Sequence, residues 1–216
     1  MNKLKIKVCG LKYINNIRHL VNEVKPDYIG FIFYPLSSRF APKYLNPKSI
    51  RYVPERIKKT GVFVNESREK IRHYVENYQL DAVQLHGQES PELCKSLQES
   101  GLEVVKSFSF KGKSTLSHCR KYMDVADYFL FDTPGPLYGG NGSRFNWLEL
   151  KEESPPKPYF LSGGIDLEDA YRIQHLLLPN IYGVDINSRF EISPGKKDIK
   201  KIMKFSEILI RQIITL

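Results

Sequence analysis

Short apolar runs alternate with helix-like segments along the whole chain of 216 residues. The run at 28–33 is continuously apolar, which is typical of a strand buried on both faces of a parallel sheet. The run at 4–8 instead alternates apolar and polar positions, as a half-buried strand does. Together these patterns predict eight strands, at residues 4–8, 28–33, 61–64, 82–85, 103–107, 128–131, 159–162 and 181–186.

The segments between these strands carry signals that start and stop helices. Ser67 and Ser90 are suited to cap helices, Pro91 suits a first helical position, and Gly101 suits a helix end. The expected helices cover residues 13–24, 67–78, 90–101, 114–123, 147–150, 166–178 and 198–214, with a weak candidate at 46–53 that Pro54 interrupts.

Eight strand–helix units of about 25–30 residues are what a closed parallel barrel needs. We therefore expect residues 1–216 to form a single-domain (β/α)8 TIM barrel. The main alternative is a doubly wound open sheet, which typically has fewer strands. The first strand is not followed by a Gly-x-Gly-x-x-Gly turn, and this counts against a dinucleotide-binding fold.

The net charge and the cysteine content indicate which binding partners and which cellular compartment to expect. The net charge of +9 favours anionic ligands, including nucleic acid, but the Lys and Arg residues are scattered and no helix-turn-helix or zinc-finger pattern accompanies them. A solvated basic surface is the simpler interpretation, so neither nucleic acid nor a membrane is expected as a partner. Three cysteines without metal-ligand spacing indicate free thiols in a reducing compartment, and we expect a cytoplasmic protein: Cys9, Cys94 and Cys119.

Candidate chemistry lies just past the strand ends, because these positions share one rim of a barrel. Cys9 ends the first strand before Gly10, although a lone cysteine there is more often a small buried hydrophobe. Asp132 follows four apolar residues and is equally suited to a helix cap, an ion pair or a general acid–base role. The glycine-rich loop behind it favours a functional role. Arg39 is suited to clamp a carboxylate or to lie at the surface, and His86 is a weaker candidate.

A phosphate site is predicted after the seventh and eighth strands. Ser162-Gly163-Gly164-Ile165 allows close approach of a ligand to the backbone, and Asn187 and Ser188 follow the eighth strand. Loops at these two places form the recurrent phosphate site of barrel enzymes. The alternative is that the two glycines only make a tight turn.

These pieces, in their order and spacing, resemble the phosphoribosylanthranilate isomerase family over nearly the whole chain. The motifs that carry the resemblance are Lys7-Val8-Cys9-Gly10, Gly30-Phe31-Ile32-Phe33-Tyr34-Pro35 with Ser37 and Arg39, Gly61-Val62-Phe63-Val64-Asn65, Val83-Gln84-Leu85-His86-Gly87, Phe131-Asp132-Thr133, Gly139-Gly140-Asn141-Gly142 with Phe145-Asn146-Trp147, Leu161-Ser162-Gly163-Gly164-Ile165, Val184-Asp185-Ile186-Asn187-Ser188 and Pro194-Gly195-Lys196-Lys197-Asp198.

The resemblance implies a (β/α)8 barrel that works without cofactor or metal. Its reaction is the Amadori rearrangement of N-(5-phosphoribosyl)anthranilate to 1-(2-carboxyphenylamino)-1-deoxyribulose 5-phosphate, a step of tryptophan biosynthesis. Cys9 matches the general base, Asp132 the general acid and Arg39 the arginine that holds the anthranilate end. The expected substrate-binding residues are Arg39, Gln84, Gly140, Gly142, Gly163, Gly164, Asp185, Asn187 and Ser188.

This chemistry sets conditions on two pKa values. A free aspartic acid has a pKa near ~3.9, so the site must raise the pKa of Asp132 for it to deliver a proton. The general base implied for Cys9 is a thiolate, which requires at neutral pH that the pKa of the thiol be lowered. We expect Cys9 to be the reactive thiol, because Cys94 and Cys119 fall within predicted helices.

Three departures from the family pattern affect the loops. Lys12 replaces the usual threonine after the Cys-Gly turn, Arg189 changes the loop after the eighth strand, and residues 134–136 read Pro-Gly-Pro. Lys12 and Arg189 either add positive charge near the substrate or point to solvent. The partner is expected to be a small phosphorylated substrate, and a monomer is expected over a homodimer. The rival interpretations are another phosphosugar barrel, such as indoleglycerol-phosphate synthase or a histidine-pathway isomerase, a non-catalytic phosphate-binding barrel and a basic nucleic-acid-binding module.

Overall fold

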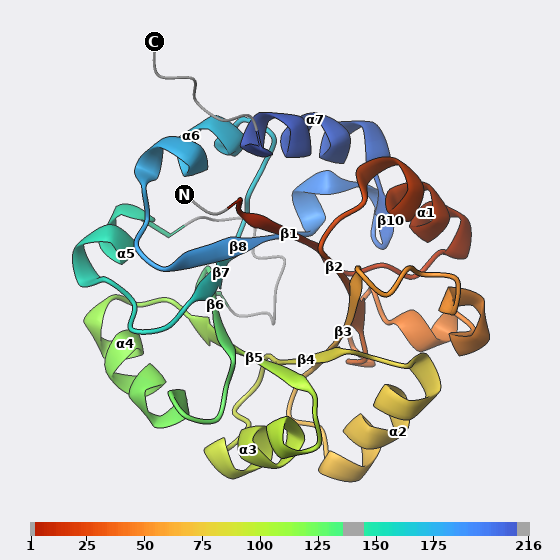
Figure 1. The fold of residues 1–216 in the computed structure, drawn as a ribbon, viewed down its shortest axis with the longest axis horizontal. Coiled ribbons are helices and arrows are strands. Elements are labelled where there is room, and N and C mark those ends of the chain that lie inside the picture. Colours follow the sequence, from red (N-terminus) through yellow and green to blue (C-terminus); the bar gives the residue numbers. More distant parts are fainter. Residues whose placement is uncertain (1–2, 136–144, 211–216) are drawn as a thin grey trace.

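The computed structural model describes residues 3–135 and 145–210. Eight parallel strands hydrogen-bond in sequence order, and β8 pairs with β1 to close a barrel. Helices surround the barrel on its outside (Figure 1). The expected (β/α)8 fold is thus confirmed, while the prediction that residues 1–216 form one domain stays a prediction. The strands are β1 Lys5–Val8, β2 Tyr28–Ile32, β3 Lys58–Phe63, β4 Ala82–Leu85, β5 Glu103–Ser109, β6 Tyr128–Asp132, β7 Tyr159–Leu161 and β8 Ile181–Ile186.

The helices that follow β3 and β4 begin where the capping residues indicated. The Ser67 side chain accepts a hydrogen bond from the Lys70 backbone, and Ser90 does the same for Leu93 ahead of a helix that starts with Pro91. The helices are α1 Ile14–His19 with the π-helical turn η1 Leu20–Val24, α2 Arg68–Tyr78, α3 Pro91–Glu99, α4 Lys113–Cys119 with the 3-10 turn η4 Arg120–Tyr122, α5 Leu148–Glu153, α6 Asp169–Leu176 and α7 Ile199–Ile210.

The link between β2 and β3 departs from the expected pattern. The structure describes all of this link, and in place of the weak helix at 46–53 it contains two short 3-10 turns, η2 Ala41–Lys43 and η3 Pro47–Ile50. Each turn has a proline in its first two positions, and a proline has no backbone N–H to continue a helix. The prediction of a helix there was therefore wrong.

A small hairpin follows β8 and was not expected from the sequence. After the 3-10 turn η5 Ser188–Phe190, strand β9 Glu191–Ser193 pairs antiparallel with β10 Lys196–Lys197. Gly195 in the connecting turn has a φ of 85°, a left-handed value that favours glycine. The hairpin lies beside α1 (Figure 1), where Asn16 hydrogen-bonds the backbone of Lys197.

Alternation along the strands separates two apolar clusters. The larger cluster packs the outward-facing side chains against the helices. The smaller cluster comes from β2, β5, β6 and β7 and consists of Tyr28, Val105, Leu130 and Phe160. Polar side chains lie at both ends of this cluster: Lys58 and Glu103 form an ion pair at the amino ends of β3 and β5, whereas Gln84, Asp132 and Asp185 line a cavity at the carboxyl ends of their strands. No helix in the described ranges is long and apolar enough to cross a membrane.

Candidate active site

Most of the expected site residues line one cavity of about 70 Å³ at the carboxyl ends of the strands. Gly140 and Gly142 lie outside the described residues. Arg39 does not line this cavity, but its side chain lies against the turn at Gly10. The expected residues that share the cavity are Cys9, Gln84, Asp132, Gly163, Gly164, Asp185, Asn187 and Ser188.

The Cys9 thiol lies against the backbone of Gly30 in the neighbouring strand β2. A Cβ atom at Gly30 would lie 2.8 Å from Cys9 Sγ and 3.1 Å from Cys9 Cα. Cys9 is 4% exposed, whereas Cys94 and Cys119 are packed on the helical side of the barrel, where they are completely buried. The expected placement of Cys9 at the rim and of the other two cysteines in helices is thus confirmed.

Adding a methyl group at Gly30 tests this packing. The family resemblance implies that Cys9 is the general base, so we expect Gly30→Ala to displace the thiol and to lower kcat by about tenfold or more. A positional error of about an ångström is costly in catalysis. Overpacking should also lower the stability by about 1–3 kcal/mol. Steady-state kinetics and thermal unfolding measure the two effects. Gly101→Asn is the matched control, because the space around Gly101 is open and asparagine tolerates its positive φ. Equal kcat in Gly30→Ala and wild type would contradict this packing role.

Lys7 interacts with Cys9 and has no role predicted from the sequence. Its ammonium group is completely buried, 3.0 Å from the Asp185 carboxylate and 2.7 Å from Gln84 Oε1. Burial alone would lower the pKa of Lys7, but Asp185 and Cys9 together outweigh this effect, so the pKa lies above its ordinary value. The signal for this residue was its position two residues before Cys9, because residues two apart in a strand face the same side.

The electrostatics around Cys9 differ from the expected lowered pKa. Burial raises the pKa of the Cys9 thiol above its ordinary value, and the Lys7 and Lys197 cations offset this only in part. The resting group is therefore the thiol, and the cations favour the thiolate once it forms.

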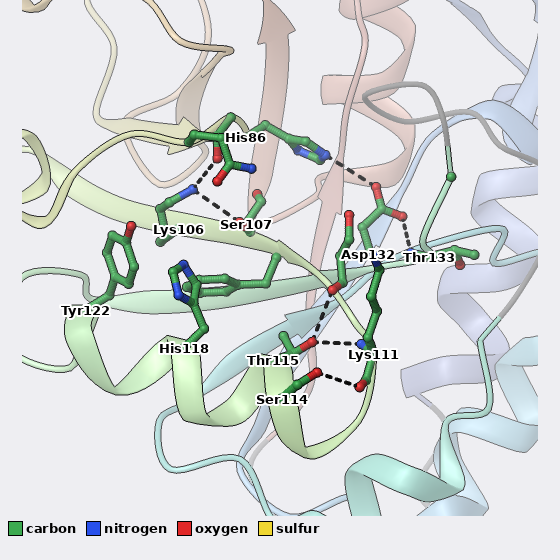
Figure 2. A pocket seen from close by; sticks show the side chains of 15 residues that line it. His86, Lys106, Ser107, Lys111, Ser114, Thr115, His118, Tyr122, Asp132 and Thr133 are labelled. Carbon is green, nitrogen blue, oxygen red and sulfur yellow. Dashed lines mark hydrogen bonds and ion pairs between the residues drawn. The ribbon is translucent and has the colours of Figure 1, made fainter.

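The pKa of Asp132 is raised, as a general acid requires. Burial raises its pKa to about 6, although the Thr133 backbone N–H, 2.8 Å from Oδ1, acts in the opposite direction. The other oxygen, Oδ2, lies 3.5 Å from His86 Nε2 (Figure 2). His86 is therefore part of the site, although its sequence position alone made it a weak candidate.

The glycine loop after β7 packs against this acid. A Cβ atom at Gly163 would lie 2.2 Å from Thr133 Oγ1 and 3.0 Å from Asp132 Oδ1, and the φ values of Gly163 and Gly164 are 92° and 65°. The two glycines therefore allow both the turn and the close approach. Helix α6 starts only at Asp169, whose carboxylate accepts the Asp166 backbone N–H, so the helix start lies further from the glycines than expected.

Arg39 is held by a carboxylate of the hairpin after β8. Its Nη2 lies 2.7 Å from Glu191 Oε2, and its Nε donates to both Glu191 oxygens. Glu191 Oε1 also accepts from the buried Lys197 ammonium group, which in turn donates to Asn187 Oδ1 at 2.7 Å. Burial lowers the pKa of Lys197 to about 8, partly offset by Glu191. A chain of ion pairs and hydrogen bonds thus joins Arg39 to the loop that carries Asn187 and Ser188.

The structure shows where two of the residues that differ from the family pattern lie. Lys12 is buried rather than solvated: its ammonium group donates to the Ser38 carbonyl and lies 4.4 Å from the ring centre of Tyr44. Arg189 is exposed on η5. The Pro134-Gly135-Pro136 segment extends into residues outside the described ranges.

A larger cavity of about 460 Å³ opens beside the same acid (Figure 2). It lies between the ends of β4, β5 and β6 and helix α4, and His86 and Asp132 line both cavities. The buried Lys106 in its wall is committed to Glu89 and to the carbonyl groups of Leu85 and Gly87. In the described ranges, no group of three His, Cys, Asp or Glu side chains is placed to hold a metal ion.

Comparison with known proteins gives the family. The family model described as N-(5'-phosphoribosyl)anthranilate (PRA) isomerase matches residues 6–208. The chain belongs to the phosphoribosylanthranilate isomerase family. This membership makes it an isomerase of tryptophan biosynthesis.

Individual relatives cover almost the whole chain. The N-(5'-phosphoribosyl)anthranilate isomerase of Parabacteroides distasonis is 41% identical over 213 residues, 97% of this chain and 95% of that protein. A crystal structure of a phosphoribosylanthranilate isomerase with reduced 1-(o-carboxyphenylamino)-1-deoxyribulose 5-phosphate is 30% identical, with a TM-score of 0.79 and coverage of 95% and 98%. A structure of monomers generated from the dimeric phosphoribosylanthranilate isomerase of Thermotoga maritima is 29% identical, with a TM-score of 0.75 and the same coverage.

Proposed function

We propose that the protein converts N-(5-phosphoribosyl)anthranilate to 1-(2-carboxyphenylamino)-1-deoxyribulose 5-phosphate, with Cys9 as general base and Asp132 as general acid. The observation that carries this proposal is that both side chains line one cavity together with the glycine loop after β7. The direct test is turnover: the fluorescence of the anthranilate substrate should decay when purified protein is added. A barrel that only binds a phosphorylated ligand would leave the fluorescence unchanged.

The reaction is balanced by these two groups. The carboxylic acid of Asp132 gives its proton to the ring oxygen, the bond from C1 to that oxygen breaks, and the nitrogen lone pair forms a protonated Schiff base. The Cys9 thiolate then removes the proton at C2, and the electron pair moves to the positively charged nitrogen. Ketonisation of the resulting enaminol returns a proton to C1, so the product is an isomer of the substrate. Because the Schiff base is the electron sink, the reaction calls for neither a cofactor nor a metal.

The protonation states follow from the pKa values. At neutral pH the resting site holds a Cys9 thiol and a largely ionised Asp132, because burial raises the pKa of the thiol and that of Asp132 is about 6. The reactive form holds the same proton on Asp132 instead, next to a Cys9 thiolate. Lys7 and Lys197 favour this form by lying near the developing thiolate. The reactive form is thus a tautomer of the resting form with the same total charge.

This scheme fixes the sign of the pH dependence. Below pH 6 both groups are protonated and the site is inactive, so kcat/KM should rise as the pH increases through about 6. If Cys9 were already ionised, activity would instead fall through the same range as Asp132 lost its proton. Because the substrate phosphate titrates nearby with a pKa of about 6, Asp132→Asn is the control and should lose the part of the rise that belongs to the enzyme. A fall in kcat/KM from pH 5 to pH 7 would contradict the scheme.

The phosphate is proposed to bind at Gly163, Gly164, Asn187 and Ser188, which all line the cavity. We expect Gly164→Val to raise KM about tenfold or more for the phosphorylated substrate, because the backbone at this φ of 65° disfavours a branched side chain. The matched measurement is the affinity for inorganic phosphate, which should weaken in parallel. A ligand complex with the phosphate at the loops after β2 and β3 would show that this assignment is wrong.

Arg39 is proposed to bind the anthranilate carboxylate while Glu191 holds its guanidinium in place. Gln84 and Asp185, which line the cavity, are proposed to contact the substrate. Gly140 and Gly142, which lie outside the described residues, are also proposed to bind it. We predict that the protein is a monomer, although a relative is dimeric. Analytical ultracentrifugation measures the oligomeric state directly. A cytoplasmic location is proposed because Cys9, Cys94 and Cys119 are all free thiols.

A further inference from the structure

The structure contains a continuous line of side chains from Lys7 to the proposed acid. Lys7 lies at one end of this line, and its ammonium group has three donors and no acceptor. It donates to Gln84 Oε1 at 2.7 Å, in a place where both residues are buried. The contact therefore fixes which way the Gln84 amide points: its oxygen faces Lys7 and its nitrogen faces away.

The orientation of Gln84 fixes the proton on His86. Gln84 Nε2 lies 2.9 Å from His86 Nδ1, and an amide nitrogen only donates. Nδ1 must therefore accept, so the single proton of the neutral ring is on Nε2. A doubly protonated ring would place two donors against each other at this contact. In agreement, burial lowers the pKa of His86 to about 4, and the Lys106 and Lys7 cations act in the same direction.

The protonated nitrogen of His86 faces the acid. His86 Nε2 is 3.5 Å from Asp132 Oδ2, and Figure 2 shows the imidazole pointing toward the carboxyl group. The separation is longer than an ordinary N–H···O hydrogen bond, so the contact acts mainly as an oriented dipole. Because the Thr133 backbone N–H holds Oδ1, donors approach the carboxyl group at both oxygens.

We propose that Gln84 and His86 are positioning residues: Gln84 selects the Nε2–H tautomer of His86, and His86 orients Asp132 and stabilises its ionised form. The inference rests on the proposed function for the role of Asp132 in turnover, but the tautomer and the Asp132 ionisation are properties of the free protein. Gln84 thereby gains a role besides the substrate contact proposed above, because both polar ends of its side chain are engaged by Lys7 and His86.

The role predicts a matched pair of variants. A glutamine at position 86 places an amide nitrogen near the position of the imidazole Nε2, whereas a leucine has no donor. His86→Leu should therefore raise the pKa of Asp132 by about one unit relative to wild type, because the ionised carboxyl loses a donor. His86→Gln should retain most of the wild-type value. The other charges that act on Asp132, those of Lys7 and Asp185, are unchanged in both variants.

NMR of the full isotope-labelled chain tests both parts without turnover. The nitrogen shifts of His86, assigned by their absence in His86→Gln, should report a proton on Nε2 in wild type. Gln84→Glu should move the proton to Nδ1, because both carboxylate oxygens accept. The carboxyl carbon shift of Asp132, assigned with Asp132→Asn, reports the pKa of this group. That pKa should be highest in His86→Leu and close to the wild-type value in His86→Gln. His175→Leu, on the exposed face of α6, is the control and should change neither quantity.

Two results would overturn the proposal: a wild-type His86 protonated on Nδ1, or the same Asp132 titration in His86→Leu and wild type. The pH dependence of kcat/KM adds a functional measurement. The midpoint of its low-pH rise should lie at a higher pH in His86→Leu than in wild type and His86→Gln, as the pKa of Asp132 does. If turnover failed in every form while the NMR results held, the proposed reaction would be wrong but the positioning contact would remain.

Discussion

Cys9→Ala is expected to lower kcat by about two to four orders of magnitude, the usual range for loss of a general base. The side chain is small and buried beside Gly30, so the variant should fold and should bind a product analogue nearly as wild type does. Stopped-flow fluorescence gives kcat, and titration of the analogue gives its Kd. In the proposed mechanism the thiolate acts on the reacting carbon and does not bind the substrate in its ground state, so the loss should appear in kcat.

Cys94→Ala is the matched control for this change. Cys94 is equally free but is completely buried in α3, away from the cavity. Its variant should lose stability through the cavity it creates, yet keep kcat per folded molecule. A folded Cys9→Ala variant with kcat within tenfold of wild type would rule out Cys9 as the base.

Asp132→Asn is expected to bind a product analogue within a few-fold of wild type while losing about two or more orders of magnitude in kcat. Asparagine keeps the size of the side chain and still accepts the Thr133 backbone N–H, but it cannot deliver the proton. Kinetics and analogue binding on the same preparation test both statements.

Stability gives Asp132→Asn a second, independent result. Burial raises the folded pKa of Asp132 to about 6, whereas an unfolded aspartic acid has a pKa of about 3.9. Between these values the folded protein holds a proton that the unfolded chain has lost, so stability falls as the pH rises through this window. Above it, the ionised carboxyl costs about 3 kcal/mol, from roughly 1.4 kcal/mol per pKa unit. The Asn variant should therefore melt at or above the wild-type temperature at pH 8. A lower Tm with preserved turnover would instead assign Asp132 to a structural role.

The sequence by itself determined the strands, most of the helices and the shared rim. These features follow from local patterns: apolar runs, alternation with a period of two, and capping residues such as Ser67 and Ser90. Because all parallel strands of a barrel end at the same rim, the positions of Cys9 and Asp132 followed once the strands were assigned. The proline-rich link between β2 and β3 forms short turns in place of the predicted helix, because its helical pattern is weak and its prolines favour short turns.

Only the tertiary structure decided which polar groups meet. Lys7 and Gln84 are 77 residues apart, and Arg39 and Glu191 are 152 residues apart. Both contacts depend on the closed barrel. Closure also places Lys7 directly opposite Asp185 in the register of β1 and β8. No local pattern encodes that neighbourhood.

The pKa values also depended on the fold, because burial and neighbouring charges set them. The sequence predicted that the pKa of Asp132 must rise, and the burial of its carboxyl group supplies this rise. It predicted the opposite sign for Cys9, whose burial outweighs the nearby cations. Residue identity and strand position thus determined where the reactive groups lie, whereas the packing of the closed barrel determined which of them holds the proton.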